Sequence, residues 1–258
     1  MLSGNPQYFK YSNGKYDAYR DKSGVTLFDR SKNTYYFIAN GKGLPDWEWQ
    51  SINVKNQYTL PLLMAVTVVG TIAYVFGVII QRNGILIDEY RYVPLVLVFL
   101  LIYGLLQAIL HEAAHIFTLL MHGHNSDKIG FKFDYGFIPS FFVRVNKVLL
   151  LPPGRRMTVH LAGVFVNSVI NLFLLVLAQK LNWGNVVTVT FILYTFGICV
   201  NFLPFYNSDG YKTLLCMLGI KEKAEGMSGT LKGVRLASVL FILIYIVYTL
   251  YAIVKFYE

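Results

Sequence analysis

The chain alternates between long apolar segments and shorter polar ones, and the apolar segments set the expected architecture. A transmembrane helix needs about 20 consecutive, mainly apolar residues. Five segments meet this requirement, and they cover approximately residues 60–80, 93–121, 157–178, 186–206 and 237–254. We therefore expect an α-helical polytopic membrane protein with about five transmembrane helices, whose core occupies residues 59–258.

Residues 1–58 precede the first apolar segment and are polar and rich in turn-forming pairs. Tyrosine-rich runs within residues 7–43 are separated at Asn13-Gly14, Ser23-Gly24, Lys32-Asn33 and Asn40-Gly41. Such pairs favour tight turns between antiparallel strands. We expect a small cytoplasmic β-meander here as the N-terminal domain. We expect no cleavable signal peptide, because no apolar stretch lies where its hydrophobic region would be.

A second β-rich stretch follows the second apolar segment. Aromatic and β-branched residues between Ile129 and Val145 surround Gly136 and Pro139, which indicates a hairpin or a re-entrant loop. Pro139 lacks a backbone N–H and limits which edge of such a hairpin can pair with another strand. We expect a membrane-associated β-hairpin loop at this place.

Composition and charge support the membrane assignment and orient the chain. Hydrophobic residues make up 55% and charged residues 14% of the sequence. With five spans, every Lys and Arg falls on one side except Arg82, Arg91, Lys180 and Lys255, and the positive-inside rule makes that side cytoplasmic. We expect a multi-pass protein of the cell membrane in a bacterial host, with its N-terminus cytoplasmic and its C-terminus outside. The net charge of +9 is then a topology signal with the lipid bilayer as partner, and no nucleic acid or nucleotide is expected.

The final third of the second apolar segment contains three ionisable residues, in the sequence His111-Glu112-Ala113-Ala114-His115. Ionisable groups at membrane depth are costly without a metal or another partner, so they indicate a functional site. On a helix, the spacing of four residues places both imidazoles on one side, where they can hold a zinc ion. Glu112 can then reach a water molecule beside the metal. A catalytic zinc ion takes a third protein ligand as well.

The third ligand is expected at the end of the fourth apolar segment, in the stretch NFLPFYNSDG at residues 201–210. The second and fourth segments cross in the same direction in the five-span topology. His111, His115 and Asp209 should therefore reach a similar depth, near the cytoplasmic face. Glu112 and Asp209 are the two carboxylates at that depth, which leaves Asp209 as the partner of the histidines.

Both motifs resemble those of the site-2 proteases, a family of zinc metalloproteases that cut within the membrane. That family combines HExxH with N-x-x-P-x-x-x-x-D-G, and the matching residues here are Asn201, Pro204, Asp209 and Gly210. A third family motif, A-G-P-x-x-N, is similar to residues 162–167, although Val164 replaces its proline. The resemblance covers roughly residues 93–215 and suggests a divergent branch of the family that processes peptides.

The resemblance implies one zinc ion per chain, a general base, and two polar contacts to the substrate backbone or the developing oxyanion. The zinc ligands would be His111, His115 and Asp209, the base Glu112, and the polar contacts Asn167 and Asn201. Alternatively, the side-chain amides of Asn167, Asn201 and Asn171 could form hydrogen bonds between helices. His122 is expected to be interfacial rather than a ligand, because a fourth protein ligand would close the catalytic position. The implied substrate is a membrane-embedded peptide or transmembrane helix, held in extended form by the β-element.

The sequence leaves the substrate and two other classes of function open. Because no docking domain for a large substrate is evident, we expect cleavage near the cytoplasmic face that matures a small peptide or pheromone precursor. Release of a membrane-tethered regulator is the other proteolytic role. A non-proteolytic zinc-binding immunity or sensor protein is the main alternative, although an intact Glu112 speaks against it. A di-iron oxidase would need about eight nitrogen ligands, and the chain has 5 histidines.

Overall fold

The computed structural model describes residues 8–22, 24–39, 46–81, 93–126, 128–134, 138–144, 146–205, 208–219 and 233. The chain divides into two compact units. The first unit combines Met1–Leu63 with Glu112–Val159, and the second combines Met64–His111 with His160–Glu258. The domain boundary expected between residues 58 and 59 stays a prediction.

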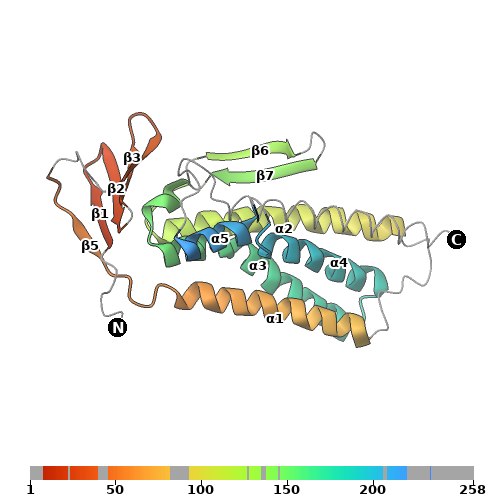
Figure 1. Ribbon diagram of the computed structural model, residues 1–258. Helices are drawn as coiled ribbons and strands as arrows, with labels where there is room; N and C mark the ends of the chain where they lie inside the picture. Colours follow the sequence, from red (N-terminus) through yellow and green to blue (C-terminus); the bar gives the residue numbers. More distant parts are fainter. Residues whose placement is uncertain are drawn as a thin grey trace. The chain divides into compact units, whose positions relative to one another are not determined.

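A five-stranded antiparallel sheet forms the N-terminal part of the first unit (Figure 1). In spatial order its strands are β4 (Thr34–Ala39), β3 (Gly24–Asp29), β2 (Tyr16–Asp21), β1 (Tyr8–Ser12) and β5 (Gln50–Ile52). The turn after β1 follows the predicted pair, because the Asn13 side chain accepts hydrogen bonds from the Lys15 and Tyr16 amides and Gly14 has a φ of 80°. The N-terminal meander is thus confirmed, while β5, which pairs with β1, was not predicted.

The sheet packs on η2 (Asn146–Leu150), a short 3-10 helix of the same unit. Their shared core consists of Tyr8, Tyr19, Phe28 and Leu150. Arg156 lies over the Tyr19 ring, 5.1 Å from its centroid, and donates hydrogen bonds to the carbonyls of Leu149 and Leu151. This buried guanidinium ties the loop before α3 to the sheet.

The hairpin predicted after the second apolar segment is confirmed as β6 (Lys128–Asp134) and β7 (Ile138–Arg144). The two strands pair antiparallel, from Lys128 opposite Arg144 to Asp134 opposite Ile138. Figure 1 shows them as a separate two-stranded ribbon. Its association with a membrane stays a prediction.

The described helices are α1 (Thr59–Gln81), α2 (Val93–Met121), α3 (Pro153–Lys180), α4 (Asn185–Phe202) and α5 (Asp209–Leu218). Within the described residues, the first four are long and apolar enough to cross a membrane. Four of the five predicted spans are therefore confirmed as helices. The fifth, at residues 237–254, lies outside the described residues, so the count of about five is not established.

Two helix boundaries differ from those expected. The fourth span was expected to reach residue 206, but α4 ends at Phe202. Pro204 lacks an N–H and disfavours a helical conformation of the residue before it, and Leu203 accordingly is extended at φ −67° and ψ 149°. Helix α3 begins earlier than expected, at Pro153, because proline is favoured in the first position of a helix.

The helices of the second unit pack through two apolar clusters. The larger joins α1, α2, α3 and α4 through Val75, Val78, Tyr103, Leu175, Ala178, Phe191 and Ile192. The smaller consists of Val68, Val164 and Ile198. Large apolar side chains remain exposed on the outer faces of α1 and α2, among them Val66, Val69, Phe76, Ile80, Leu97, Leu101, Ile102 and Leu106. So large an exposed apolar surface suits lipid better than water.

Candidate metal centre

The HExxH residues lie on the continuous helix α2, as the sequence predicts. His111 and His115 are 9% and 6% exposed, and Glu112 is half-buried. Because side chains four residues apart share a helical face, the two imidazoles point to the same side. Their common orientation is therefore a property of one helix.

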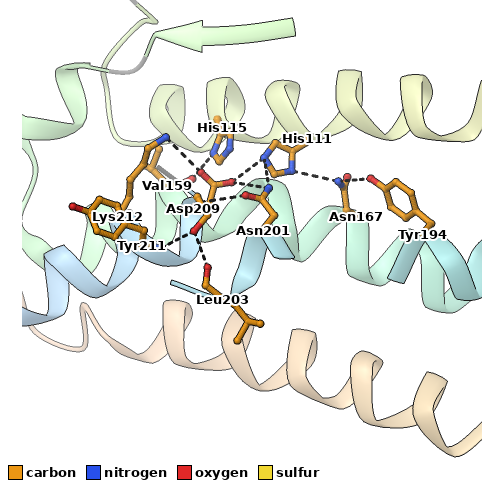
Figure 2. Close-up of polar contacts among 11 residues, drawn as sticks. His111, His115, Val159, Asn167, Tyr194, Asn201, Leu203, Asp209, Tyr211 and Lys212 are labelled. Carbon is orange, nitrogen blue, oxygen red and sulfur yellow. Dashed lines mark hydrogen bonds and ion pairs between the residues drawn. The ribbon is translucent and has the colours of Figure 1, made fainter. Parts of the chain in front are cut away.

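The imidazole of His111 is held between two helices of the second unit (Figure 2). Its Nε2 lies 2.8 Å from Oδ2 of Asp209, and its ring lies directly against Gly163 of α3. A Cβ at position 163 would be 2.5 to 2.6 Å from three atoms of the ring. The absence of a side chain at Gly163 therefore makes room for the imidazole.

His115 is oriented by the main chain of α3. Its Nδ1 lies 2.7 Å from the carbonyl oxygen of Val159. Since a carbonyl can only accept, Nδ1 carries the hydrogen and Nε2 carries the lone pair that a metal requires. Such a hydrogen bond to the outer nitrogen is a common feature of metal-ligating histidines.

Asp209 is placed by a tight connection between α4 and α5. It is the first residue of α5, whose N-cap Ser208 accepts a hydrogen bond from the Tyr211 amide and donates one to the Leu203 carbonyl. Gly210 lies so close to the carbonyl of Phe202 that a Cβ there would overlap it. The glycine of the DG pair thus allows α5 to begin immediately beside the end of α4.

Asn201 and Lys212 contact the Asp209 carboxylate from opposite sides. The Nδ2 of Asn201 lies 3.4 Å from both Asp209 Oδ2 and His111 Nε2, and its Oδ1 accepts from the Asp209 amide at 3.3 Å. Lys212 Nζ lies 3.9 Å from the other carboxylate oxygen. Asn201 therefore fixes both the main chain and the side chain of Asp209.

His111, His115 and Asp209 each offer one ligand atom, and these atoms all lie within 4.8 Å of one another. All three residues are buried. Two imidazoles and one carboxylate form a donor set typical of catalytic zinc, and a fourth position remains for water or substrate. The described residues thus fit a zinc ion, and His122 is not a member of the group.

Asn167 and Asn171 lie one turn apart on α3 and have different surroundings. Asn167 Nδ2 lies 3.3 Å from His111 Nδ1 and 2.9 Å from the Tyr194 hydroxyl. Asn171 instead bonds across helices, to Thr195 and to the Phe191 carbonyl. The sequence-based prediction missed the Tyr194 hydroxyl as a partner of Asn167. It also missed the Val159 carbonyl as a partner of His115, because main-chain groups leave no signal in residue types.

The chain is 28% identical over 217 residues to the "Putative peptide zinc metalloprotease protein YydH" of Bacillus subtilis (strain 168). The chain resembles a zinc metalloprotease. The match covers 83% of this chain and 84% of the relative, so it includes both the HExxH helix and the segment with Asp209. No family model matches the chain, and no solved structure matches it. The similarity agrees with the site-2 protease resemblance of the motifs and supports a metallopeptidase.

Proposed function

We propose that this protein is an intramembrane zinc metalloprotease that hydrolyses a peptide bond of a membrane-embedded substrate near the cytoplasmic face. The buried group of His111, His115 and Asp209 carries the proposal, since its ligand atoms lie within 4.8 Å of one another. The two histidines belong to a helix that is apolar and long enough to cross a membrane. Similarity to a zinc metalloprotease over most of the chain supports the same chemistry.

Each residue of the site has a role in this reaction. A zinc ion supplies a Lewis acid that polarises a peptide carbonyl and acidifies water. Glu112 takes the proton of the attacking water and passes it to the leaving nitrogen as the C–N bond breaks. Val159 holds His115 in the tautomer that presents Nε2, and Asn201 holds the carboxylate of Asp209 in place.

The β6–β7 hairpin suits the presentation of a helical substrate. A transmembrane helix uses its own carbonyls in hydrogen bonds, so it must unwind before a water molecule can attack. An extended substrate segment can add as a strand to an open edge of the hairpin, which would satisfy the exposed backbone groups. Pro139 removes one donor from β7, so the β6 edge is the more complete template.

The proposed substrate is a small peptide precursor, such as a pheromone or a leader-bearing peptide. The relative is named as a peptide zinc metalloprotease, and this relative comes from a bacterium. The sequence between the predicted spans contains no segment long enough for a separate docking domain. The proposed setting is the cell membrane, with the N-terminal sheet and the active site toward the cytoplasm.

Comparative mass spectrometry of membrane and secreted peptides would test the proposal. Cells that naturally express the protein would carry either the wild type or Glu112→Gln, which keeps the three ligands and removes the base. We expect peptides that end within an apolar segment only in the wild-type cells. Identical sets of peptides in both strains, at equal protein levels and with zinc bound, would contradict proteolysis and support a non-proteolytic immunity or sensor role.

A further inference from the structure

The carboxamide of Asn167 lies between His111 and Tyr194, and Figure 2 shows it in line with both. Its Nδ2 lies 3.3 Å from His111 Nδ1 and 2.9 Å from the Tyr194 hydroxyl oxygen. Its Oδ1 is buried, and no residue that the structure describes forms a hydrogen bond with it. Asn167 itself is 6% exposed. A buried amide oxygen without such a partner calls for an explanation.

The tautomer of His111 bears on how this carboxamide is oriented. Nε2 of His111 faces Asp209 at 2.8 Å, so Nε2 is the nitrogen that faces the proposed zinc ion. A neutral imidazole that binds a metal through Nε2 carries its hydrogen on Nδ1. This Nδ1–H needs an acceptor, and the Nδ2 of Asn167 is a donor.

A half-turn of the Asn167 carboxamide exchanges the positions of Oδ1 and Nδ2 without moving the rest of the side chain. Oδ1 then accepts from the Nδ1–H of His111, and the Tyr194 hydroxyl can donate to the same oxygen. In the present orientation Oδ1 has no partner among the described residues, and after the half-turn Nδ2 takes that position. The tautomer that zinc requires of His111 therefore decides between the two orientations.

We propose that Asn167, held by Tyr194, is a positioning residue that accepts a hydrogen bond from Nδ1 of His111 and thereby aims Nε2 at zinc. The inference rests on the proposed zinc site. Helix α3 would then orient both histidines. Its Val159 carbonyl contacts Nδ1 of His115, and its Asn167 side chain contacts Nδ1 of His111. This positioning role differs from the substrate contact that the family resemblance implies for Asn167.

Tyr194 is itself fixed, as a support of this kind requires. Its ring meets that of Tyr103 edge-on, with centroids 5.0 Å apart and planes at 74°. Tyr103 in turn accepts a hydrogen bond from Gln107 at 2.6 Å and donates one to Asn171 at 3.1 Å. The hydroxyl that holds Asn167 thus belongs to a packed polar layer between α2, α3 and α4.

The test measures the zinc affinity of the detergent-purified full-length chain by competition with a chromophoric chelator. Asn167→Leu removes the acceptor at similar volume, and we expect about 10- to 100-fold weaker binding, as is usual when such an outer partner is lost. Asn167→Asp keeps an acceptor oxygen and should bind zinc at least as tightly as the wild type. Asn171→Leu is the matched control one helical turn away, and it should lower thermal stability without weakening zinc binding.

Three results would overturn the positioning role while leaving the zinc site intact. They are wild-type affinity in Asn167→Leu, equal weakening in Asn171→Leu, and no rescue by Asn167→Asp. If Asn167→Leu does not fold, Tyr194→Phe takes its place, with weakened zinc binding as the expected result and wild-type affinity as the contrary one. A folded wild-type protein that binds no zinc would instead overturn the proposed function, so the two failures are distinguishable.

Discussion

Substitution of Gly163 by alanine tests the geometry of the metal centre with a single methyl group. The added Cβ would lie 2.5 to 2.6 Å from Cε1, Nδ1 and Nε2 of His111. Ordinary contacts between such atoms are about 3.5 to 4.0 Å, so the ring must retreat by roughly 1 Å. Metal–ligand distances tolerate only about 0.2 Å. We therefore expect Gly163→Ala to weaken zinc binding by about tenfold or more, at least as much as the loss of an outer hydrogen bond.

The assay is chelator competition on detergent-purified protein, with thermal unfolding followed in parallel. Gly104→Ala is the matched control, because it makes the same change on α2 where no described atom lies within 4 Å of the new Cβ. It should bind zinc normally and gain up to about 1 kcal/mol from helix propensity. Equal zinc affinity in Gly163→Ala and Gly104→Ala would refute the account of how α3 makes room for His111.

Three further predictions concern stability and the end of α4. Arg156→Met leaves two carbonyls without their charged donor and should lower the free energy of unfolding by about 2 kcal/mol or more. Chemical denaturation of the detergent-solubilised protein would measure this loss. An unchanged midpoint would show that this guanidinium does not stabilise the first unit. Burial lowers the pKa of His124 below its usual 6.5, with Asp17 acting in the opposite direction. The stability due to His124 is therefore complete above pH 6.5 and is lost as the pH falls through the lowered pKa. In metal-free protein, His124→Gln should lose less thermal stability than the wild type between about pH 7 and pH 5, and parallel curves would contradict this assignment. Gly210→Ala should separate α5 from α4, because its Cβ would overlap the Phe202 carbonyl. Zinc affinity should then fall together with the unfolding temperature. A normal zinc site in this variant would count against the proposed placement of Asp209.

The parts of the fold that follow from residue types were predictable, and those that depend on main-chain contacts were not. Of the five apolar runs that predicted spans, the four within the described residues are helices, and the spacing within HEAAH predicted that both histidines share a face. The shared direction of the second and fourth spans predicted that Asp209 lies at the depth of the two histidines, although it is remote from them in sequence. The contacts of His111 with Gly163 and of His115 with the Val159 carbonyl depend instead on how closely two helices approach, which no single residue type encodes.

Helix α5 is a different case, because its local signals were present and were not used. Ser208 is a favoured N-cap residue, and Gly219 ends the helix in the left-handed region at φ 65°. Both positions are helix boundary signals. The extension of α4 to residue 206 was wrong for a related reason, since Pro204 already marked a break. The apolar run alone outweighed these boundary residues in the sequence-based prediction.

The metal content of the purified protein tests the central claim most directly. Elemental analysis would compare the wild type with His111→Ala, Asp209→Ala and Glu112→Gln at matched thermal stability. We predict about one zinc ion per chain in the wild type and in Glu112→Gln, and loss of zinc in the two ligand variants, as expected for a site with three protein ligands. A well-folded wild-type protein without zinc, or zinc that remains after His111 or Asp209 is replaced, would contradict the account.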